Sequence, residues 1–222
     1  MNPLRHDFIR ACLSSSSSSP IAPLRYLDVG CGGGIFAESA ARLPTTASVT
    51  AIDPSATILA VARAHAKRDP ALRPPKLTYL HSTIEDLAAA LPASPEERFD
   101  VVSIFEVVEH VDYPAAFLDC VGQCVRPGGW LVLSTIARTW TSWVTTNLVA
   151  EDLLGVVPKG THDWHKYLNV EELEAYFEGV GGGGVWGKPV VMGVVYVPGV
   201  GWREVSGSEK VGNYFMGVQR LR

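Results

Sequence analysis

A glycine-rich stretch between two acidic residues has the residue types and spacing best suited to ligand chemistry in this sequence. It reads Asp-Val-Gly-Cys-Gly-Gly-Gly over residues 28–34, and an apolar run precedes it while a helical pattern follows it. Glycines let the backbone turn sharply and approach a ligand, and the first turn of a following helix presents unpaired N–H groups. We therefore expect a nucleotide-like ligand on this loop, bound by Gly30 and Gly32.

The spacing of the glycines distinguishes between classes of nucleotide. A dinucleotide fingerprint needs glycine at the first, third and sixth positions, but the sixth position counted from Gly30 is Ile35. No Gly-Lys-Ser/Thr follows, so a P-loop is excluded. Asp53 ends the next apolar run, where its carboxylate can accept hydrogen bonds from both hydroxyls of a ribose. With Asp28 in front of the glycines, the pattern resembles motif I of the class I S-adenosylmethionine-dependent methyltransferases.

The elements that must position these residues alternate between strands and helices. Alternation of this kind predicts a parallel sheet with right-handed crossovers. The expected fold is α/β and Rossmann-like, a seven-stranded, mostly parallel sheet with an antiparallel last strand and helices on both faces. Strands are predicted over 25–29, 48–53, 76–80, 99–104 and 130–134, helices over 4–13, 33–42, 55–67, 113–124 and 170–178, and a terminal hairpin from 190–197 and 214–218.

Composition restricts the class of protein further. A chain of 222 residues fits one α/β domain, which we expect to span 1–222. A net charge of −4 gives no electrostatic support for a nucleic-acid partner. No apolar run approaches the length of a membrane span, and the start of the chain has no signal-peptide core. Four cysteines without a Cys-x-x-Cys motif predict buried thiols in a reducing compartment.

A segment at about 138–168 departs from a minimal methyltransferase. It follows the fifth predicted strand, at the sheet end that holds the glycine loop, so we expect an insertion that covers the substrate. Trp140, Trp143 and nearby apolar residues have the spacing of a partly amphipathic helix that could lie on a membrane. A lid packed on the sheet explains the same spacing equally well.

Four blocks of sequence resemble one family within this superfamily, the ubiquinone-biosynthesis O-methyltransferases, which act on polyprenylated catechol-type rings. The block Val-Pro-Lys-Gly-Thr-His-Asp is the most discriminating, because generic class I enzymes lack it. The resemblance covers nearly the whole chain, although 180–201 aligns poorly. It also implies a tryptophan-containing segment before Asn2, and a mitochondrial presequence could have been lost with that segment. The four blocks are 2–5, 28–35, 106–111 and 157–163.

The resemblance assigns S-adenosylmethionine contacts to particular residues. Arg5, Gly30, Asp53 and Phe105 match contact positions of the family, and the Arg5 guanidinium can pair with the methionine carboxylate. Ile84 falls in a cluster at the end of the third predicted strand, a position that lines the adenine in methyltransferases. For its neighbour Thr83, a simple helix cap is an equally good interpretation.

The resemblance also implies a site for a divalent metal. Glu106, Glu109 and His110 match residues assigned to such an ion, and if a helix begins near Glu106 all three share one face. Two carboxylates suit Mg²⁺, although similar runs occur in methyltransferases that bind no metal. A phenol with a pKa near 10 costs about 4 kcal/mol to ionise at pH 7, so either a cation or His110 as general base must activate it.

Finally, the resemblance implies partners and a location. It predicts a polyprenylated phenolic substrate, membership of a ubiquinone-biosynthesis complex, and peripheral contact with the matrix side of the mitochondrial inner membrane, or with the cytoplasmic membrane face in a bacterium. Two alternatives stay open. One is a methyltransferase for another small acceptor, such as a carboxylic acid or an amine. The other is a non-catalytic S-adenosylmethionine-binding subunit that scaffolds an assembly.

Overall fold

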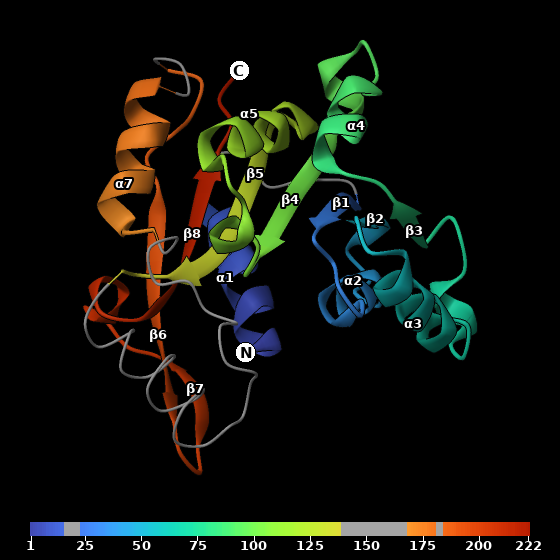
Figure 1. Ribbon diagram of the computed structural model, residues 1–222, viewed down its shortest axis with the longest axis horizontal. Helices are drawn as coiled ribbons and strands as arrows, with labels where there is room; N and C mark the ends of the chain where they lie inside the picture. Colours follow the sequence, from blue (N-terminus) through green and yellow to red (C-terminus); the bar gives the residue numbers. More distant parts are fainter. Residues whose placement is uncertain (16–22, 139–167, 181–183) are drawn as a thin grey trace.

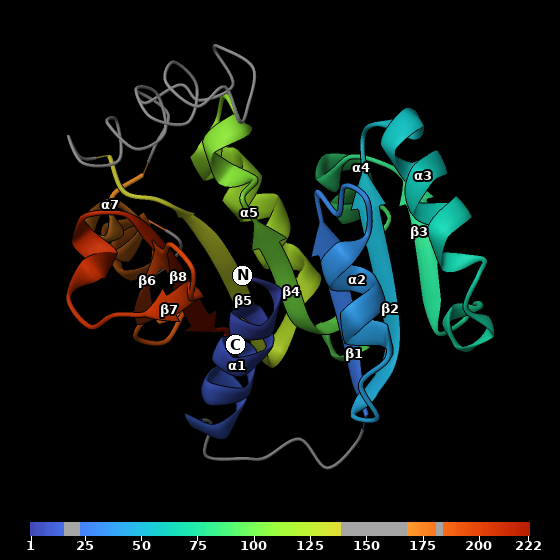
Figure 2. The same cartoon turned by 90° about the horizontal axis from the view of Figure 1, so that it is seen from below.

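The computed structural model describes residues 1–15, 23–138, 168–180 and 184–222, and its strands form one eight-stranded sheet (Figure 1). The spatial order is β3-β2-β1-β4-β5-β8-β6-β7, so β1 and β4 lie near the middle (Figure 2). The parallel strands are β1 (Leu24–Val29), β2 (Thr46–Asp53), β3 (Leu77–His81), β4 (Phe99–Phe105) and β5 (Val125–Ile136). The remaining strands, β6 (Val190–Val197), β7 (Gly201–Glu204) and β8 (Asn213–Gln219), pair in antiparallel fashion.

The predicted antiparallel sense of the last strand is confirmed, but the sheet has one strand more than the seven expected. β8 runs antiparallel to both β5 and β6. The additional strand is β7, which among the described strands pairs with β6 alone. Proline followed by a glycine at φ 78° (Gly199) turns the chain back at this point, and the Val200 N–H donates to the Val197 carbonyl at 3.0 Å. β6 and β8 are therefore direct neighbours without forming a simple hairpin.

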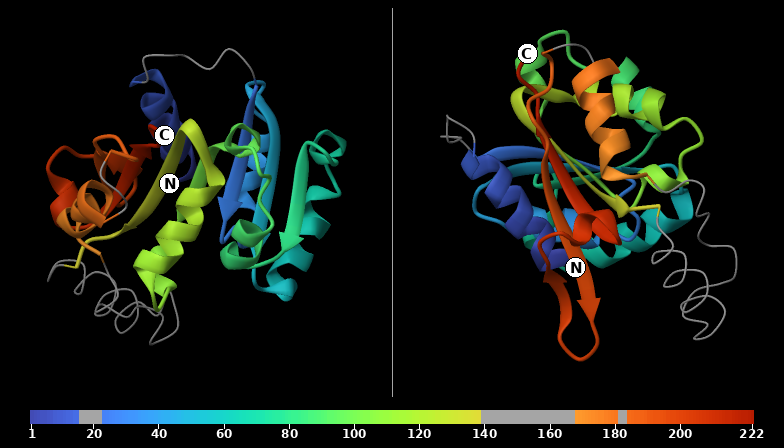
Figure 3. Two further views of the ribbon diagram at one scale, coloured as in Figure 1. Left: turned by 90° about the horizontal axis from the view of Figure 1, so that it is seen from above. Right: turned by 90° about the vertical axis from the view of Figure 1, so that its left-hand side faces the viewer.

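Helices cover both faces of the sheet (Figure 3). α1 (Asn2–Ser15) and α2 (Ile35–Ala41) pack on one face, and the end of α3 (Ala56–Ala66) joins the same apolar cluster. The opposite face is covered by α4 (Ile84–Ala89), α5 (Pro114–Cys124) and α7 (Val170–Ala175). Because both faces are covered, the central strands carry apolar residues on both faces, as in the largely apolar run 101–105 of β4.

Several helices begin at the capping residues that the sequence offers. The Ser55 hydroxyl accepts from the Ile58 N–H at 3.3 Å at the start of α3. The Thr83 hydroxyl accepts from the Asp86 N–H at 3.2 Å at the start of α4, so Thr83 does cap a helix. Asn169 forms a capping box with Glu172 at the start of α7. Shorter 3₁₀ turns lie at Pro70–Leu72, Pro95–Glu97, Val108–His110 and Ser208–Lys210, and a π-helical turn at Tyr176–Val180 follows α7.

The segment predicted to cover the substrate lies almost wholly outside the described residues, and so do Trp140 and Trp143. The residues on either side of this segment are described, and side-chain contacts join them. The Arg138 N–H donates to the Asn169 side-chain oxygen at 2.9 Å, and the Arg138 guanidinium pairs with Glu172 at 2.6 Å. The described chain therefore enters and leaves this segment at neighbouring points.

Two predictions from composition can be compared with the described residues. The four cysteines are free thiols, with Cys12 and Cys124 buried and Cys31 and Cys120 half-buried. Within the ranges that the structure describes, no helix combines the length and apolar character needed to cross a membrane.

Candidate functional site

The glycine loop joins β1 to α2 and holds three glycines in a left-handed backbone conformation. Their φ angles are 67° at Gly30, 52° at Gly32 and 82° at Gly34, a region that L side chains rarely adopt. A Cβ added to Gly30 would lie 2.6 Å from a methyl carbon of Val107, whereas one added to Gly32 would meet no atom within 4 Å. Gly30 is therefore required by packing, and Gly32 borders open space where a ligand can approach.

Asp53, the predicted ribose acid, lies at the end of β2 directly beside this loop. One of its oxygens accepts from the Gly32 N–H at 2.9 Å and the other from the Ser55 N–H at 2.8 Å. The side chain is 8% exposed, so these bonds hold it in one position. Each carboxylate oxygen accepts more than one hydrogen bond, which leaves capacity for ligand hydroxyls. The carboxylate therefore lies beside the loop at the end of β2, and its role as the ribose acceptor stays a prediction.

Asp28, the acid in front of the glycines, has a different role. It is 3% exposed, and the Ser103 hydroxyl of β4 donates to it at 2.7 Å. Burial raises the pKa of Asp28 to about 7, against the opposing effects of the Ser103 hydrogen bond and the nearby Arg5. This buried carboxyl therefore joins the residue in front of the glycine loop to β4, and it is not exposed to a ligand.

Arg5 extends from α1 to the end of β4, more than one hundred residues away in sequence. Its guanidinium lies 4.7 Å from the centre of the Phe105 ring and pairs with Glu106 at 3.2 Å. The side chain is 14% exposed. Its Nε is buried and has no hydrogen-bond partner in the described part of the chain. An unpaired buried donor on a cation indicates a place for an anionic ligand.

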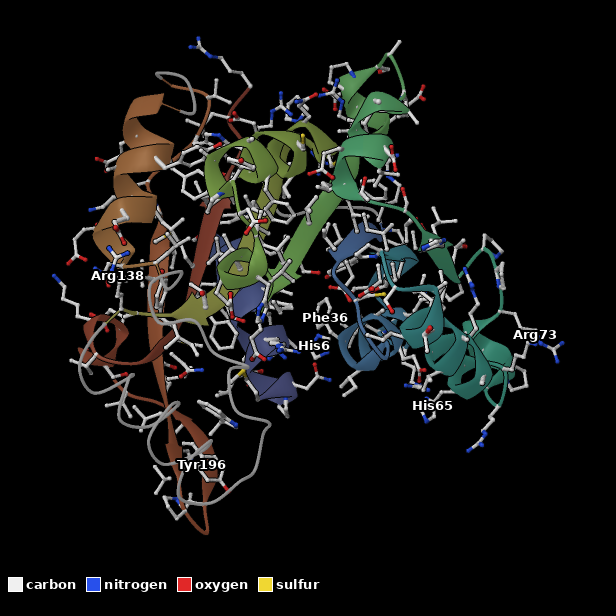
Figure 4. The ribbon with its side chains drawn as sticks, viewed as in Figure 1. His6, Phe36, His65, Arg73, Arg138 and Tyr196 are labelled. Carbon is white, nitrogen blue, oxygen red and sulfur yellow. The ribbon has the colours of Figure 1, made fainter. Side chains whose placement is uncertain are left out.

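An aromatic stack fixes the ring beneath Arg5. Phe105 is 7% exposed and meets Phe36 of α2 edge-on at 4.8 Å, and Phe36 stacks on His6 of α1 at 5.1 Å. Figure 4 shows His6 and Phe36 side by side. His6 also bonds the Ser39 hydroxyl at 2.7 Å. The Phe105 ring therefore belongs to the core, and this stack ties α1 to α2 and β4.

The predicted adenine residue, Ile84, is the first residue of α4. It is 3% exposed, and its side chain belongs to the core cluster beneath α4, α5 and α7. Its position just after β3 places its backbone at the same edge of the sheet as Asp53.

The three predicted metal ligands do not converge. These side chains would share one face only if a helix began near Glu106, and it does not, because Glu106 has φ 58° and a 3₁₀ turn (Val108–His110) follows it. Glu106 pairs with Arg5, while Glu109 accepts from the Thr135 hydroxyl at 2.9 Å. His110 is exposed and ends the 3₁₀ turn. In the ranges that the structure describes, no group of three or more His, Cys, Asp and Glu side chains could hold a metal ion. The residues present therefore do not fit Mg²⁺.

Glu109 is itself an unusual carboxyl. It is 7% exposed, and burial raises its pKa to about 7, opposed by the hydrogen bonds that it accepts and reinforced by the charge of Glu106. Sequence reasoning missed its partner Thr135 and the Asp28 partner Ser103, because both lie on other strands far away in the chain.

A pocket of about 450 Å³ lies at the other end of β1 from the glycine loop. It is formed by α1, the start of β1 and the turn between α2 and β2, with Ile9, Leu24 and Leu43 among its walls. Of the site residues described above, only His6 lines it. The pocket is therefore separate from the predicted ligand site.

Comparison with known proteins identifies the family. A methyltransferase-domain family model matches residues 5–181. The "Ubiquinone biosynthesis O-methyltransferase, mitochondrial" of Candida albicans is 45% identical over 201 residues, 90% of this chain and 59% of that protein. The Schizosaccharomyces pombe protein of the same name is 38% identical over 231 residues, 99% of this chain and 77% of that protein. The chain belongs to the ubiquinone biosynthesis O-methyltransferase family.

The chain spans 59% of the Candida albicans relative and 59% of the Saccharomyces cerevisiae relative, which is 41% identical. Solved structures confirm the class I methyltransferase fold. The plantazolicin methyltransferase BpumL, in complex with a triazolic desmethylPZN analogue and SAH, has a TM-score of 0.67 at 14% identity, covering 98% of this chain and 83% of that one. The methyltransferase domain of a bacterial Hen1 protein has a TM-score of 0.64 at 16% identity, covering 99% and 100%.

Proposed function

We propose that this chain transfers a methyl group from S-adenosylmethionine to a phenolic hydroxyl of a polyprenylated catechol-type ring in ubiquinone biosynthesis. The observation that carries the proposal is a cradle with two chemically different ends. Asp53 offers carboxylate acceptors at one end of the glycine loop, and Arg5 offers a buried, unpaired N–H at the other. A ribose and a methionine carboxylate need these two groups. The names of the relatives supply the acceptor class.

The residues of the cradle have separate tasks. Asp53 binds the ribose, and Arg5 pairs with the carboxylate. Gly30 lets the loop turn beside Val107, and Gly32 lets the ligand approach the backbone. Ile84 and Phe105 offer their backbones, since their rings and methyl groups lie in the core. Fixing the cofactor in this way aligns its sulfonium with the acceptor oxygen for in-line displacement.

The proton of the phenol needs an acceptor, and we assign this role to His110. It is exposed just beyond β4, at the sheet edge of the glycine loop. The oxygen forms a bond to the methyl carbon as the carbon–sulfur bond breaks, and the phenol proton passes to His110. S-adenosylhomocysteine and a methyl ether result. No step of this mechanism passes through a metal.

The test is methyl transfer from labelled cofactor to a short-tailed dihydroxybenzoate, with and without a chelator. We expect transfer in both conditions and strong loss in His110→Ala, while the affinity for S-adenosylmethionine stays unchanged. Transfer to a carboxylic acid or an amine but not to the catechol would overturn the acceptor assignment. Loss of transfer on chelation, with recovery on adding Mg²⁺, would restore Glu106, Glu109 and His110 as metal ligands.

We also propose that the chain works at the matrix side of the mitochondrial inner membrane, as a peripheral protein within a ubiquinone-biosynthesis complex. The names of the Candida albicans and mouse relatives include the word mitochondrial, and a polyprenyl tail is insoluble in water. Liposome sedimentation tests the contact by comparing the wild type with Trp140→Ser/Trp143→Ser. Equal partitioning of the two folded proteins would refute docking through these tryptophans.

A further inference from the structure

Arg5 pairs with Glu106, and binding of a carboxylate by Arg5 gives no reason for an acid at this position. The amino-acid end of S-adenosylmethionine carries an ammonium group as well as a carboxylate, so its complement is a cation beside an anion. We propose that Arg5 and Glu106 together bind this zwitterionic end, Arg5 taking the carboxylate and Glu106 the ammonium group. The inference rests on the proposed function and adds to it a residue that recognises the cofactor.

The backbone of Glu106 supports this role. Glu106 is the one non-glycine residue with positive φ in the described ranges, and its φ is 58°. Such a conformation is strained for an L-residue, so it persists only where its surroundings impose it. Here the Glu106 N–H donates to the Ser134 carbonyl of β5 at 2.9 Å, while the side chain reaches Arg5. The turn thus aims a carboxylate at α1 instead of continuing the strand.

The location of Glu106 fits an ammonium group on the glycine loop. Val107, the next residue, lies against Gly30, so Glu106 stands beside the first glycine of the loop. Asp53 stands at the third residue of that loop, through its bond with the Gly32 N–H. A cofactor whose ribose lies at Asp53 therefore has its amino-acid end at Arg5 and Glu106.

The other acids near the loop already have fixed partners. Asp28 is buried against Ser103, and Glu109 is buried against Thr135. The side chain of Glu106 is 45% exposed and uses one oxygen for Arg5, so it retains accepting capacity that faces solvent. Among these three acids, Glu106 is the one that a ligand can reach.

Calorimetry with two ligands tests the inference, in buffer that contains a chelator. S-adenosylhomocysteine carries the amino-acid end, and 5′-methylthioadenosine lacks it. We expect Glu106→Gln to weaken S-adenosylhomocysteine about tenfold, as for loss of a charge-assisted hydrogen bond, and to leave 5′-methylthioadenosine unchanged. Glu96→Gln, an exposed acid at the opposite end of β4, is the matched control and should change neither affinity.

A third ligand distinguishes the role of Arg5 from that of Glu106. The decarboxylated analogue of S-adenosylhomocysteine keeps the ammonium group, so Glu106→Gln should weaken it while Arg5→Gln should not. Glu106→Gly provides a second variant, because glycine removes the strain at positive φ and the protein should fold at least as well. It should lose the preference for S-adenosylhomocysteine over 5′-methylthioadenosine in the same way.

Three results would overturn the inference. One is an equal loss of affinity for both ligands in Glu106→Gln, which indicates a merely structural role. Another is unchanged affinity for S-adenosylhomocysteine. The third is an effect of the substitution that appears only when Mg²⁺ is added, which indicates a metal ligand. A wild type that binds neither ligand would instead refute the proposed function.

Discussion

Gly30 and Gly32 share a left-handed backbone conformation, but Gly30 is packed against Val107 while Gly32 borders open space. We therefore expect substitution of Gly30 to reduce mainly stability, and substitution of Gly32 to reduce mainly ligand affinity. Alanine at Gly30 meets both an unfavourable φ and Val107, so we expect Gly30→Ala to cost about 2–4 kcal/mol of unfolding free energy. Gly32→Ala meets only the unfavourable φ, at about 1 kcal/mol, but its methyl group enters the space of the ligand. Urea unfolding and calorimetry with S-adenosylhomocysteine measure the two effects.

The control is Gly30→Ala combined with Val107→Ala. Removing the Val107 methyl groups should recover the steric part of the loss in Gly30→Ala and leave the part due to φ. A double variant no more stable than Gly30→Ala would show that Val107 is not the obstacle.

Asp53 holds the glycine loop through the Gly32 N–H and is proposed to bind the ligand. Its substitution should therefore affect both the loop and the ligand affinity. We expect Asp53→Ala to weaken S-adenosylmethionine and S-adenosylhomocysteine by about 1.5–3 kcal/mol, through lost charge-assisted hydrogen bonds. Asp53→Asn is the matched variant, since its side-chain oxygen can still accept from the Gly32 or Ser55 N–H. Unchanged affinity in Asp53→Ala, measured by calorimetry, would show that the ribose does not bind at Asp53.

The buried Asp28 gives a pH dependence of stability. Its pKa is about 7 in the folded protein and about 4 in an unfolded chain, so the folded state binds more protons between these values. Protonation of Asp28 therefore stabilises the folded wild type, relative to Asp28→Asn, fully below about pH 4. This contribution to the unfolding free energy is lost as the pH rises through about 7. We expect the unfolding free energy of the wild type to fall relative to that variant by a few kcal/mol across this window.

Denaturant titrations at several pH values measure this difference, and the raised pKa of Glu109 cancels because both proteins contain it. Parallel curves for the wild type and Asp28→Asn would contradict the assignment.

Residue types alone located the loop and Asp53, because glycine at positive φ and an acid at a strand end are both local signals. The arrangement around Glu106 was not predictable in the same way. Its positive φ depends on a hydrogen bond to Ser134 and on Arg5, which are distant in the chain. A helix that begins near Glu106, the condition under which the three predicted metal ligands would share one face, does not form.

At the scale of elements, Asn169 joins a helix cap to the stem of the 139–167 segment. Its side-chain oxygen accepts from the Arg138 N–H at 2.9 Å and takes part in the capping box of α7. We expect Asn169→Ala to destabilise the protein by about 1–2 kcal/mol, as for loss of an N-cap. Thermal unfolding measures the loss.

Asn169→Asp keeps a capping oxygen and should retain most of the stability. Equal destabilisation by Ala and Asp would show that the amide group, rather than the cap, is what matters at this position.

The parallel strands were predicted to within a few residues at most ends, since short apolar runs bounded by polar residues are a strong signal. β7 was missed because Gly-Trp-Arg-Glu shows no alternation and is too short to stand out. β5 begins earlier than expected, at Val125. Residues 126–129, Arg-Pro-Gly-Gly, lie within β5, where the pairing with β4 is irregular between Phe99 and Val101. Pairing with a neighbour, which sequence periodicity cannot show, decided both cases.

For the whole molecule, the alternation of strands and helices was enough to predict the layered fold, because a sheet with apolar strands must be covered on both faces. β1 shows how the two layers are joined. Leu27 and Val29 belong to the cluster beneath α4, α5 and α7, whereas Leu24 and Tyr26 belong to the cluster beneath α1 and α2. The loop that holds the predicted cofactor is the direct continuation of this shared strand.

Because both apolar clusters meet at β1, a ligand on the glycine loop should stabilise the molecule as a unit. At a concentration one hundred times its dissociation constant, S-adenosylhomocysteine contributes about 2.7 kcal/mol to the folded state. For a chain of this length, each kcal/mol raises the melting temperature by about 2–4 °C. We therefore expect a rise of about 5–10 °C in a single cooperative transition, measured by scanning fluorimetry or calorimetry. NAD should give no rise, since the spacing of the glycines excludes a dinucleotide fingerprint, and Asp53→Ala should show a reduced rise at the same concentration. An unshifted transition with S-adenosylhomocysteine, or an equal shift with NAD, would contradict the assignment of this loop as a cofactor site.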